Sequence, residues 1–259
     1  HDIYCTTWES LQNDAKYEHP NISKLMDAEI VYCADAKYEE RLRQLRNGAK
    51  EILSAPFSQG DYAKAENQLK EAEHYYTMAM VSEHEPDVLN GAGGAIYYIE
   101  NAIAMLNKQY FHYGVKRAYD ELSAMQDRPE EFCRLIDDVI SADSAEAVKK
   151  HLTTLMKETM AVFRHVKETL ATPDRTAAGD ALTGTYEEMY SNFRNKMYAA
   201  AETGNRHLAF MSLVSASAMF SEIESGVNID RYDVWKGYDP RDLHKTARAY
   251  DDILKAYLK

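Results

Sequence analysis

Apolar residues recur at helical spacing through most of this 259-residue chain. From residue 59 to residue 81 they alternate in steps of three and four, which is typical of an amphipathic helix. Further helices are predicted from Glu85, over about 115–126 and 129–140, from Asp143 to about 171, from Thr185 to Gly204, over about 206–225, and from Pro240 onward. Because short turns join them, the pattern predicts a mainly α protein, an antiparallel helical bundle.

The first 34 residues follow a different pattern. HDIYC at 1–5 and IVYC at 30–33 are short, alternating, and rich in β-branched and aromatic residues. These features are typical of strands. We therefore predict a small N-terminal β remnant over residues 1–34 and a helical bundle domain over 35–259. Because the chain does not begin with Met, we also expect further residues before His1.

Three glycines interrupt the helix that begins at Glu85-Pro86: Gly91, Gly93 and Gly94. Each costs about 1 kcal/mol relative to alanine in a helix interior. One interpretation is close approach of a neighbouring helix, and the other is a backbone opened toward a ligand. A phosphate loop is excluded because no Lys-Ser/Thr pair follows these glycines.

The net charge and the cysteine content limit the classes of function that the chain can have. The formal net charge is −12, so the chain would repel phosphate backbones, and general nucleic-acid binding is unlikely. A cationic small molecule is compatible with this charge. The three cysteines, Cys5, Cys33 and Cys133, are far apart and suggest free thiols in a reducing compartment. Since neither a long apolar run nor a signal peptide is visible, we predict a cytoplasmic protein without membrane contact.

The sequence does not contain the motifs of two known kinds of helical active site. A di-iron bundle needs two Glu-x-x-His motifs, and only Glu71-x-x-His74 matches, with His74 off the apolar face. A helical ribonuclease of the HEPN type would need an Arg four to six residues before a His. None of the nine histidines has one.

Two groups of basic residues remain as binding candidates. Arg and Lys grouped at a helix junction can bind phosphate or carboxylate. The alternative is a solvated face paired with nearby acidic residues, which contributes little. The first group surrounds the turn NKQYFHYGVKR and consists of Lys108, His112, Lys116 and Arg117. The second flanks a helix pair and consists of Arg194, Lys196, Arg206 and His207.

Several segments together resemble a known superfamily. The order HDIYC, TTWESLQ, AEIVYC and KYEERLRQLRNGAKEIL resembles the end of a nucleotidyltransferase-like catalytic domain. AIYYIENAIAMLNKQYFHYGVKRAYDEL and GTYEEMYSNFRNKMYAAAE resemble the helical domain of two-domain members, as in the aminoglycoside-type nucleotidyltransferases. The resemblance implies transfer of a nucleotidyl group from a nucleoside triphosphate to a small acceptor, with the bundle as the acceptor-binding wall.

The same resemblance assigns roles to particular residues. Its Mg²⁺-binding motif, Gly-Ser followed by Asp-x-Asp, is not present in this chain and would lie before His1. Asp2 is the one residue that could match the third metal-binding carboxylate. Glu83 or Glu85, near the glycine-rich helix start, would be the general base. Either the basic turn at 108–117 or the Arg194–Lys196 face would contact phosphate or substrate.

Two hypotheses therefore stay open. The leading one is the substrate-side helical portion of a nucleotidyltransferase-like protein, with Mg²⁺ as cofactor if the rest of the catalytic part exists. The alternative is a non-catalytic helical module that mediates interaction or homo-oligomerisation. The acceptor and the nucleotide do not follow from the sequence.

Overall fold

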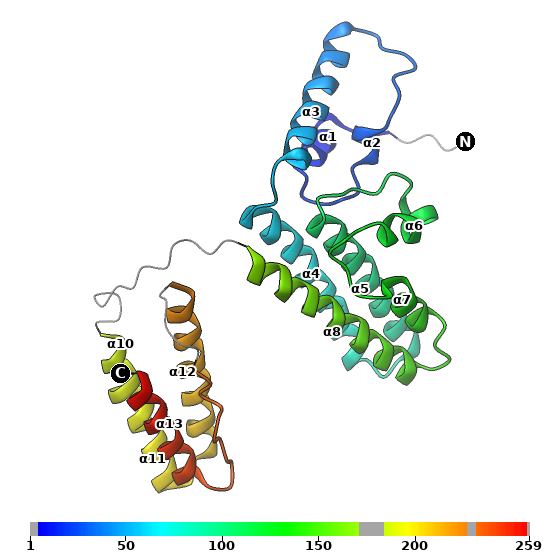
Figure 1. Cartoon of the computed structure of the whole chain (residues 1–259). Coiled ribbons are helices and arrows are strands. Elements are labelled where there is room, and N and C mark those ends of the chain that lie inside the picture. Colours follow the sequence, from blue (N-terminus) through cyan, green and yellow to red (C-terminus); the bar gives the residue numbers. More distant parts are fainter. Residues whose placement is uncertain (1–4, 171–183, 227–231, 258–259) are drawn as a thin grey trace. The chain divides into compact units, whose positions relative to one another are not determined.

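The computed structural model describes residues 5–170, 184–226 and 232–257, and every regular element in these ranges is a helix (Figure 1). The prediction of a mainly α protein is confirmed. The chain divides into two compact units, His1–Ala171 and Thr172–Lys259. Each unit is described by itself below.

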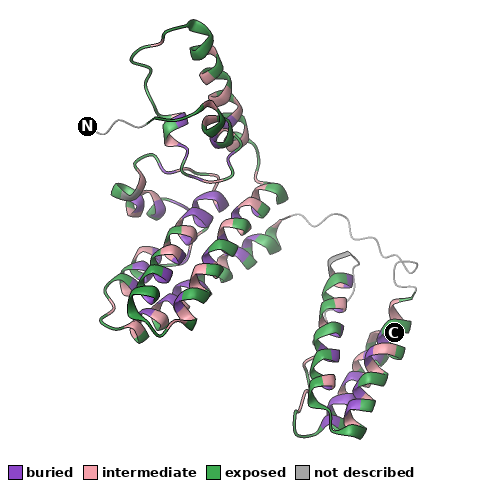
Figure 2. Cartoon of the chain, turned by 180° about the vertical axis from the view of Figure 1, so that it is seen from behind, coloured by how far each residue is buried: buried purple, intermediate pink, exposed green. Residues whose placement is uncertain are grey.

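Three long helices form the body of the first unit. α4 (Gln59–Val81), α5 (Glu85–Leu106) and α8 (Ala145–Thr169) lie side by side. Their buried residues face one another, and their outer sides are exposed (Figure 2). α4 begins in a capping box, in which the Ser58 and Asp61 side chains each bind the other's backbone N–H. The apolar stripes of α4, α5 and α8 form the core that the sequence periodicity predicts.

Shorter elements complete this unit. α1 (Trp8–Asp14), α2 (Ser23–Met26) and α3 (Ala36–Ser54) precede the body. A 3₁₀ turn, η1 (Gly114–Arg117), then α6 (Ala118–Ser123) and α7 (Phe132–Ile140) connect α5 to α8. α6 and α7 are shorter than the helices predicted at 115–126 and 129–140. α7 begins only at Phe132 because Glu131 has a positive φ angle, which α-helices exclude. Residues 115–117 belong to the 3₁₀ turn, so α6 begins at Ala118.

The glycines of α5 allow α4 to approach closely. A Cβ atom at Gly91 would lie 2.7 Å from the backbone nitrogen of Ala79. A Cβ atom at Gly94 would lie 2.3 Å from the Tyr75 ring. A Cβ atom at Gly93 would meet nothing within 4 Å. Of the two interpretations of this glycine cluster, close helix packing is the one that Gly91 and Gly94 support.

The second unit is a smaller group of helices. α10 (Thr185–Glu187), the π-helical segment η2 (Glu188–Arg194) and α11 (Asn195–Thr203) follow one another directly, and Gly204 then turns the chain with a φ of +67°. α12 (Arg206–Gly226) and α13 (Leu243–Tyr257) complete the unit. Its core contains Met189, Leu213, Phe220, Tyr250 and Leu254.

The apolar residues of α12 do not all face this core. Phe220 is buried, but Phe210, Met211 and Val214 are 43%, 44% and 36% exposed. Smaller residues, including Ala209, Ser212 and Ala216, share the buried side instead. Small side chains on the buried side of α12 allow neighbouring helices to lie close to it. The larger residues Phe210, Met211 and Val214 lie on its outer side.

The predicted β remnant does not appear in the described residues. Residues 30–33 form part of a loop between α2 and α3, in which Val31 is 96% exposed and Tyr32 84% exposed. Their alternating pattern favours a strand, but a strand needs a neighbouring strand for its hydrogen bonds. The described residues supply none. Residues 1–4 of the other predicted strand lie outside the described part of the chain.

The N-terminal residues belong to the same compact unit as α4, α5 and α8, whereas the sequence pattern predicts a domain boundary between residues 34 and 35. The Tyr17 hydroxyl donates to the Gln109 carbonyl oxygen at 2.6 Å, and the Phe111 N–H donates to the Pro20 carbonyl oxygen at 3.1 Å. The Arg46 guanidinium donates to the carbonyl oxygen of Leu25 at 2.6 Å. These contacts join residues far apart in the chain, which local patterns do not reveal.

We expect Gly91→Ala and Gly93→Ala to change stability in opposite directions. The methyl group at 91 meets the Ala79 backbone, so the free energy of unfolding should fall by about 1–3 kcal/mol. The methyl group at 93 meets only solvent, so helix propensity should raise it by about 0.5–1 kcal/mol. Urea unfolding of both variants measures the difference. A shift of the same sign in both would contradict close packing at Gly91.

Candidate functional site

The turn that follows α5 carries the first predicted group of basic residues. α5 ends at Leu106, and Lys108 then adopts a positive φ of 50°, which turns the chain sharply away from the helix axis. The Asn107 side chain donates to the carbonyl oxygens of Ile103 and Asp127, at 2.8 and 3.0 Å, and so holds the turn against the 124–127 loop. The turn is therefore fixed on both sides.

Lys108 is committed to a structural ion pair. Its Nζ donates to the Ala55 carbonyl oxygen at 2.8 Å and lies 3.3 Å from Asp61 Oδ2. The two side chains are only 9% and 12% exposed. Burial by itself would raise the pKa of Asp61, but hydrogen bonds from Ser58 and the Lys108 charge outweigh it and lower that pKa. Lys108 is therefore not available as a phosphate ligand.

Asp27 holds the aromatic part of the turn. Its Oδ1 accepts from the Tyr110 hydroxyl at 2.7 Å, and its Oδ2 lies 2.9 Å from His112 Nδ1. Burial, together with the hydrogen bond to Asp27, raises the pKa of Tyr110 well above its usual value. The Tyr110 and His112 rings lie 4.2 Å apart, centroid to centroid. Both rings are thereby fixed in position.

α6 supplies the opposite wall. The Glu121 carboxylate accepts from the backbone N–H of His112 at 2.8 Å and from that of Tyr113 at 3.0 Å. The Arg117 guanidinium lies over the Tyr113 ring, 4.9 Å from its centroid. Asp120 is exposed beside them. Glu121 therefore attaches the turn to α6 through two backbone hydrogen bonds.

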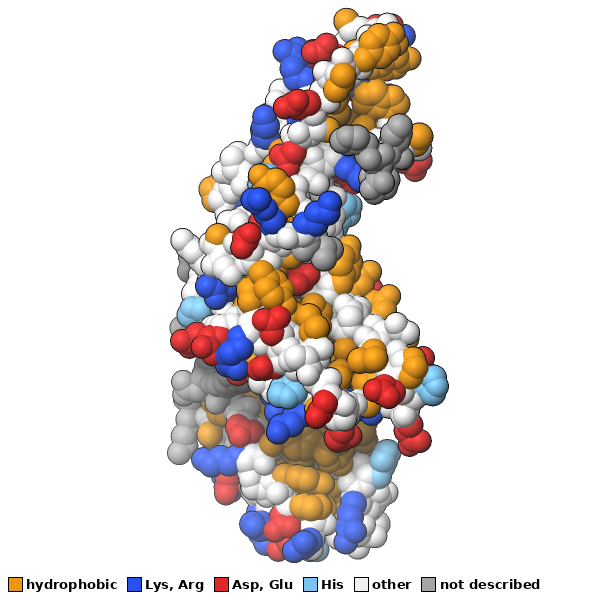
Figure 3. All heavy atoms as spheres, turned by 90° about the vertical axis from the view of Figure 1, so that its right-hand side faces the viewer, with side chains coloured by type: hydrophobic (Ala, Val, Ile, Leu, Met, Phe, Trp, Pro, Cys, Tyr) orange, Lys and Arg blue, Asp and Glu red, His pale blue; other side chains and the backbone are white. Residues whose placement is uncertain are grey.

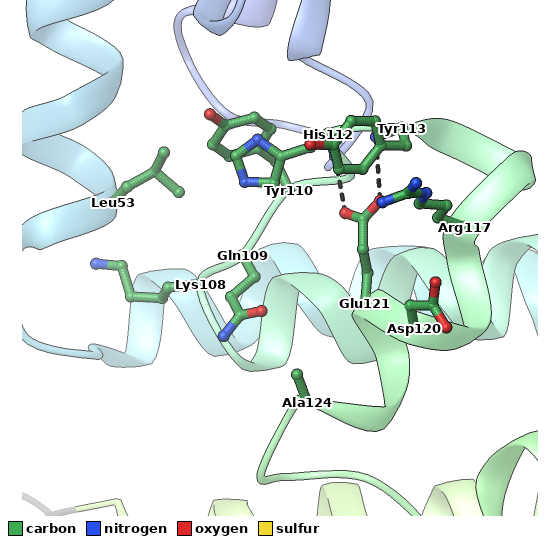
Figure 4. A pocket seen from close by; sticks show the side chains of 10 residues that line it. All are labelled: Leu53, Lys108, Gln109, Tyr110, His112, Tyr113, Arg117, Asp120, Glu121 and Ala124. Atoms are coloured by element: carbon green, nitrogen blue, oxygen red, sulfur yellow. Dashed lines mark hydrogen bonds between the residues drawn. The ribbon is translucent and has the colours of Figure 1, made fainter.

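These residues surround a pocket of about 480 Å³ within the first unit. Figure 4 shows the Tyr110, His112 and Tyr113 rings along the turn, with Glu121 extending from α6 toward its backbone. Leu53 of α3 and Ala124 also line the pocket. Because Asp61 neutralises Lys108, the charges that remain on its walls are Arg117 against Asp120 and Glu121. The lining thus combines aromatic rings with a small excess of negative charge.

The structure brings together three of the four predicted residues of this turn. Lys108, His112 and Arg117 line the pocket, whereas Lys116 is exposed on η1 and is not part of the lining. On the face drawn in Figure 3, basic side chains are interspersed with acidic ones instead of forming one large patch. The site therefore combines acidic and basic side chains, whereas the sequence predicts a basic site.

The two proposed general bases lie away from this pocket. Glu83 is exposed in the turn before α5, and Glu85 is exposed in its first turn. α5 has 22 residues, so its two ends are roughly 33 Å apart. Glu83 and Glu85 therefore cannot act on a molecule held in the pocket at the other end of α5.

The second basic group belongs to the second unit. Arg194 forms an ion pair with Asp251, whose Oδ2 also accepts from the Tyr198 hydroxyl. The Arg194 guanidinium lies over the Tyr190 and Tyr198 rings, 4.8 and 4.6 Å from their centroids. Lys196 is exposed. Arg194 thus joins α13 to η2 and α11 and has a structural role in this unit.

The residues that the resemblance assigns to Mg²⁺ lie outside the described part of the chain. No group of three or more His, Cys, Asp or Glu side chains in these residues is arranged to hold a metal ion. Asp2, the proposed metal ligand, lies outside the described residues.

Sequence reasoning missed Asp27, Asp120 and Glu121, which contribute the negative charge of the site. Glu121 belongs to the same quoted segment as the basic turn, so the alternation of charge there was a usable signal. Asp27 lies 83 residues before Tyr110, and only the fold brings them together.

Comparisons with known proteins add no relative. No family model matches the chain, and neither the curated proteins nor the solved structures include a match. In the described part of the chain, no helix is long and apolar enough to cross a membrane. The predicted cytoplasmic location stays a prediction.

We expect Lys108→Met to be strongly destabilising. It leaves Asp61 buried without its cation, which typically costs about 3–5 kcal/mol of unfolding free energy. Lys70→Met is the matched control, because Lys70 pairs with Glu66 on the surface and is 61% exposed. That change should cost less than about 1 kcal/mol. Chemical denaturation compares the two, and equal losses would contradict a buried pair.

Proposed function

We propose that this protein binds a small, amine-bearing polar molecule in the pocket between α3, the 108–113 turn and α6. We further propose that it is the acceptor-binding helical portion of a nucleotidyltransferase-like protein, which transfers a nucleotidyl group to that molecule. The resemblance of AIYYIENAIAMLNKQYFHYGVKRAYDEL to the helical domain of such proteins supports this role, because this segment contributes most of the pocket lining.

We infer the kind of ligand from the charge of the pocket. Asp120 and Glu121 outnumber Arg117, and Asp27 adds a further carboxylate behind the Tyr110 and His112 rings. Ammonium groups are attracted both to carboxylates and to the faces of aromatic rings. A phosphate group would instead meet a negative wall, since Lys108 is already paired with Asp61. An amine therefore fits this pocket better than an anion.

Asp120→Asn should weaken binding of an amine without unfolding the protein, because Asp120 is exposed. Loss of one exposed charge pair, worth roughly 1 kcal/mol, should lower affinity about threefold to tenfold. Calorimetric titration with glucosamine, with its neutral counterpart glucose and with inorganic phosphate tests this. Asp143→Asn, which removes an exposed charge from the turn before α8, is the control and should leave binding unchanged. Binding of phosphate in preference to glucosamine would overturn the proposal.

The transfer step has its own test. The protein is incubated with Mg²⁺, each nucleoside triphosphate and the bound amine, and pyrophosphate release is measured. Release that depends on the amine and is lost in Asp2→Asn would support nucleotidyl transfer. Amine binding without any release would remove the transfer step and leave an amine-binding protein.

A second candidate, a homo-oligomerisation module, is favoured by one observation. Phe210, Met211 and Val214 place exposed apolar side chains on one helix of the second unit. Exposed apolar patches often mark protein–protein contacts. In this case the α12 face would pair with a second copy of the chain.

If α12 mediates self-association, Val214→Glu should shift the protein to a monomer. The buried carboxylate would cost several kcal/mol at an apolar interface. Light scattering during size-exclusion chromatography, over a range of concentrations, measures the mass. Thr154→Glu, at an exposed position of α8, is the control and should leave the mass unchanged. A wild-type protein that is monomeric at all concentrations would exclude this candidate.

A further inference from the structure

Another pocket, of about 250 Å³, lies between α4 and α8 within the first unit. We call it the α4–α8 pocket. It shares no lining residue with the pocket beside the 108–113 turn. On each helix its lining residues recur every three or four positions, so one face of α4 and one face of α8 form its walls.

The buried part of the α4–α8 pocket is apolar. Tyr62, Leu69 and Phe163 are buried there, whereas Met160 is 40% exposed. The Tyr62 hydroxyl donates to the Phe163 carbonyl oxygen at 3.3 Å, and the two rings lie 5.8 Å apart, centroid to centroid. Because this bond occupies the Tyr62 hydroxyl, the buried part presents mainly carbon atoms to a ligand.

Charged side chains complete the lining. Lys70, Arg164 and Lys167 are cationic, and Glu66 and Glu73 are anionic. Glu66 accepts from Lys70 Nζ at 3.3 Å, and its other carboxylate oxygen lies 3.9 Å from Lys167 Nζ. One carboxylate thus faces two ammonium groups. Three cations against two carboxylates leave an excess of one positive charge.

Arg164 and Lys167 are the cations best placed to bind an anion. In the described part of the chain, the exposed Arg164 guanidinium has neither a hydrogen-bond nor an ion-pair partner. Lys167 lies one helical turn further along the same face of α8, with its Nζ 5.7 Å from the centroid of the Tyr62 ring. A guanidinium binds a carboxylate or phosphate through two parallel hydrogen bonds. An anion bound there would lie beside the apolar part of the pocket.

We propose that the α4–α8 pocket binds a small molecule with one anionic group and an apolar body, such as an arylcarboxylate. The anionic group lies between Arg164 and Lys167, and the apolar body packs against Tyr62, Leu69 and Phe163. Because most drug-sized ligands occupy roughly 300–1,000 Å³, we expect a smaller ligand with a single ring. The site differs from the amine pocket in its residues and in the sign of its charge, so it stands or falls separately.

Titration of the full chain with phenylacetate, followed by two-dimensional amide NMR, tests this site. Saturable shifts should appear in α4 and α8, within residues 62–73 and 160–167. Phenylacetamide, the neutral counterpart, should bind about threefold to tenfold more weakly. Inorganic phosphate, which has no apolar body, should bind at least about tenfold more weakly.

Two substitutions should change the affinity for phenylacetate in opposite directions. Arg164→Gln removes the guanidinium and should weaken binding about threefold to tenfold. Glu66→Gln removes the carboxylate that competes for Lys70 and Lys167, so it should strengthen binding by a similar factor. Lys150→Gln removes an exposed cation of α8 that lies roughly 21 Å along the helix from Arg164, and should leave the affinity unchanged.

Three results would overturn the proposal. The first is an absence of phenylacetate binding at millimolar concentrations. The second is an equal affinity for phenylacetate and either reference compound. The third is an unchanged affinity in Arg164→Gln. If circular dichroism shows that Arg164→Gln folds poorly, Met160→Glu adds a carboxylate at an exposed position of the same pocket, and the same weakening is expected.

Discussion

The ion pair between Lys108 and Asp61 is the contact on which the pocket depends. One ammonium group binds the Ala55 carbonyl oxygen and the Asp61 carboxylate, and so connects the end of α5 to the α3–α4 turn and the start of α4. Lys108 also has a positive φ angle. The chain turns at this residue, so that residues 110–113 lie next to the N-terminal segment. Since both side chains are almost fully buried, neither can lose its partner without leaving an uncompensated charge.

This contact determines the chemistry of the pocket as much as its shape. With Lys108 neutralised, Asp120 and Glu121 face a single guanidinium, Arg117, and the aromatic rings contribute negatively polarised faces. The result favours a positively charged ligand. Glu121 has a double role, because it contributes charge to the pocket and holds the turn through the N–H groups of residues 112 and 113.

Much of the local structure could be predicted from the sequence. The predicted stripe from Tyr62 to Ala79 is buried except for Tyr76, which is partly buried. α5 begins at Glu85-Pro86, and Gly204 turns the chain. Each depends on residues close in sequence, through helical periodicity, proline at the first helical turn, or freedom of φ. The same rules predicted a strand at 30–33, where the backbone lacks the partner that a strand requires.

The sequence by itself therefore determined most of the helices after residue 35 and the position of the turn that carries the candidate site. The structure decided that Gly91 and Gly94 serve close helix packing. Only the tertiary structure decided which charges of that turn are free. Lys108 and Asp61 are 47 residues apart, and Tyr110 and Asp27 are 83 apart, so their pairing follows from packing and not from spacing.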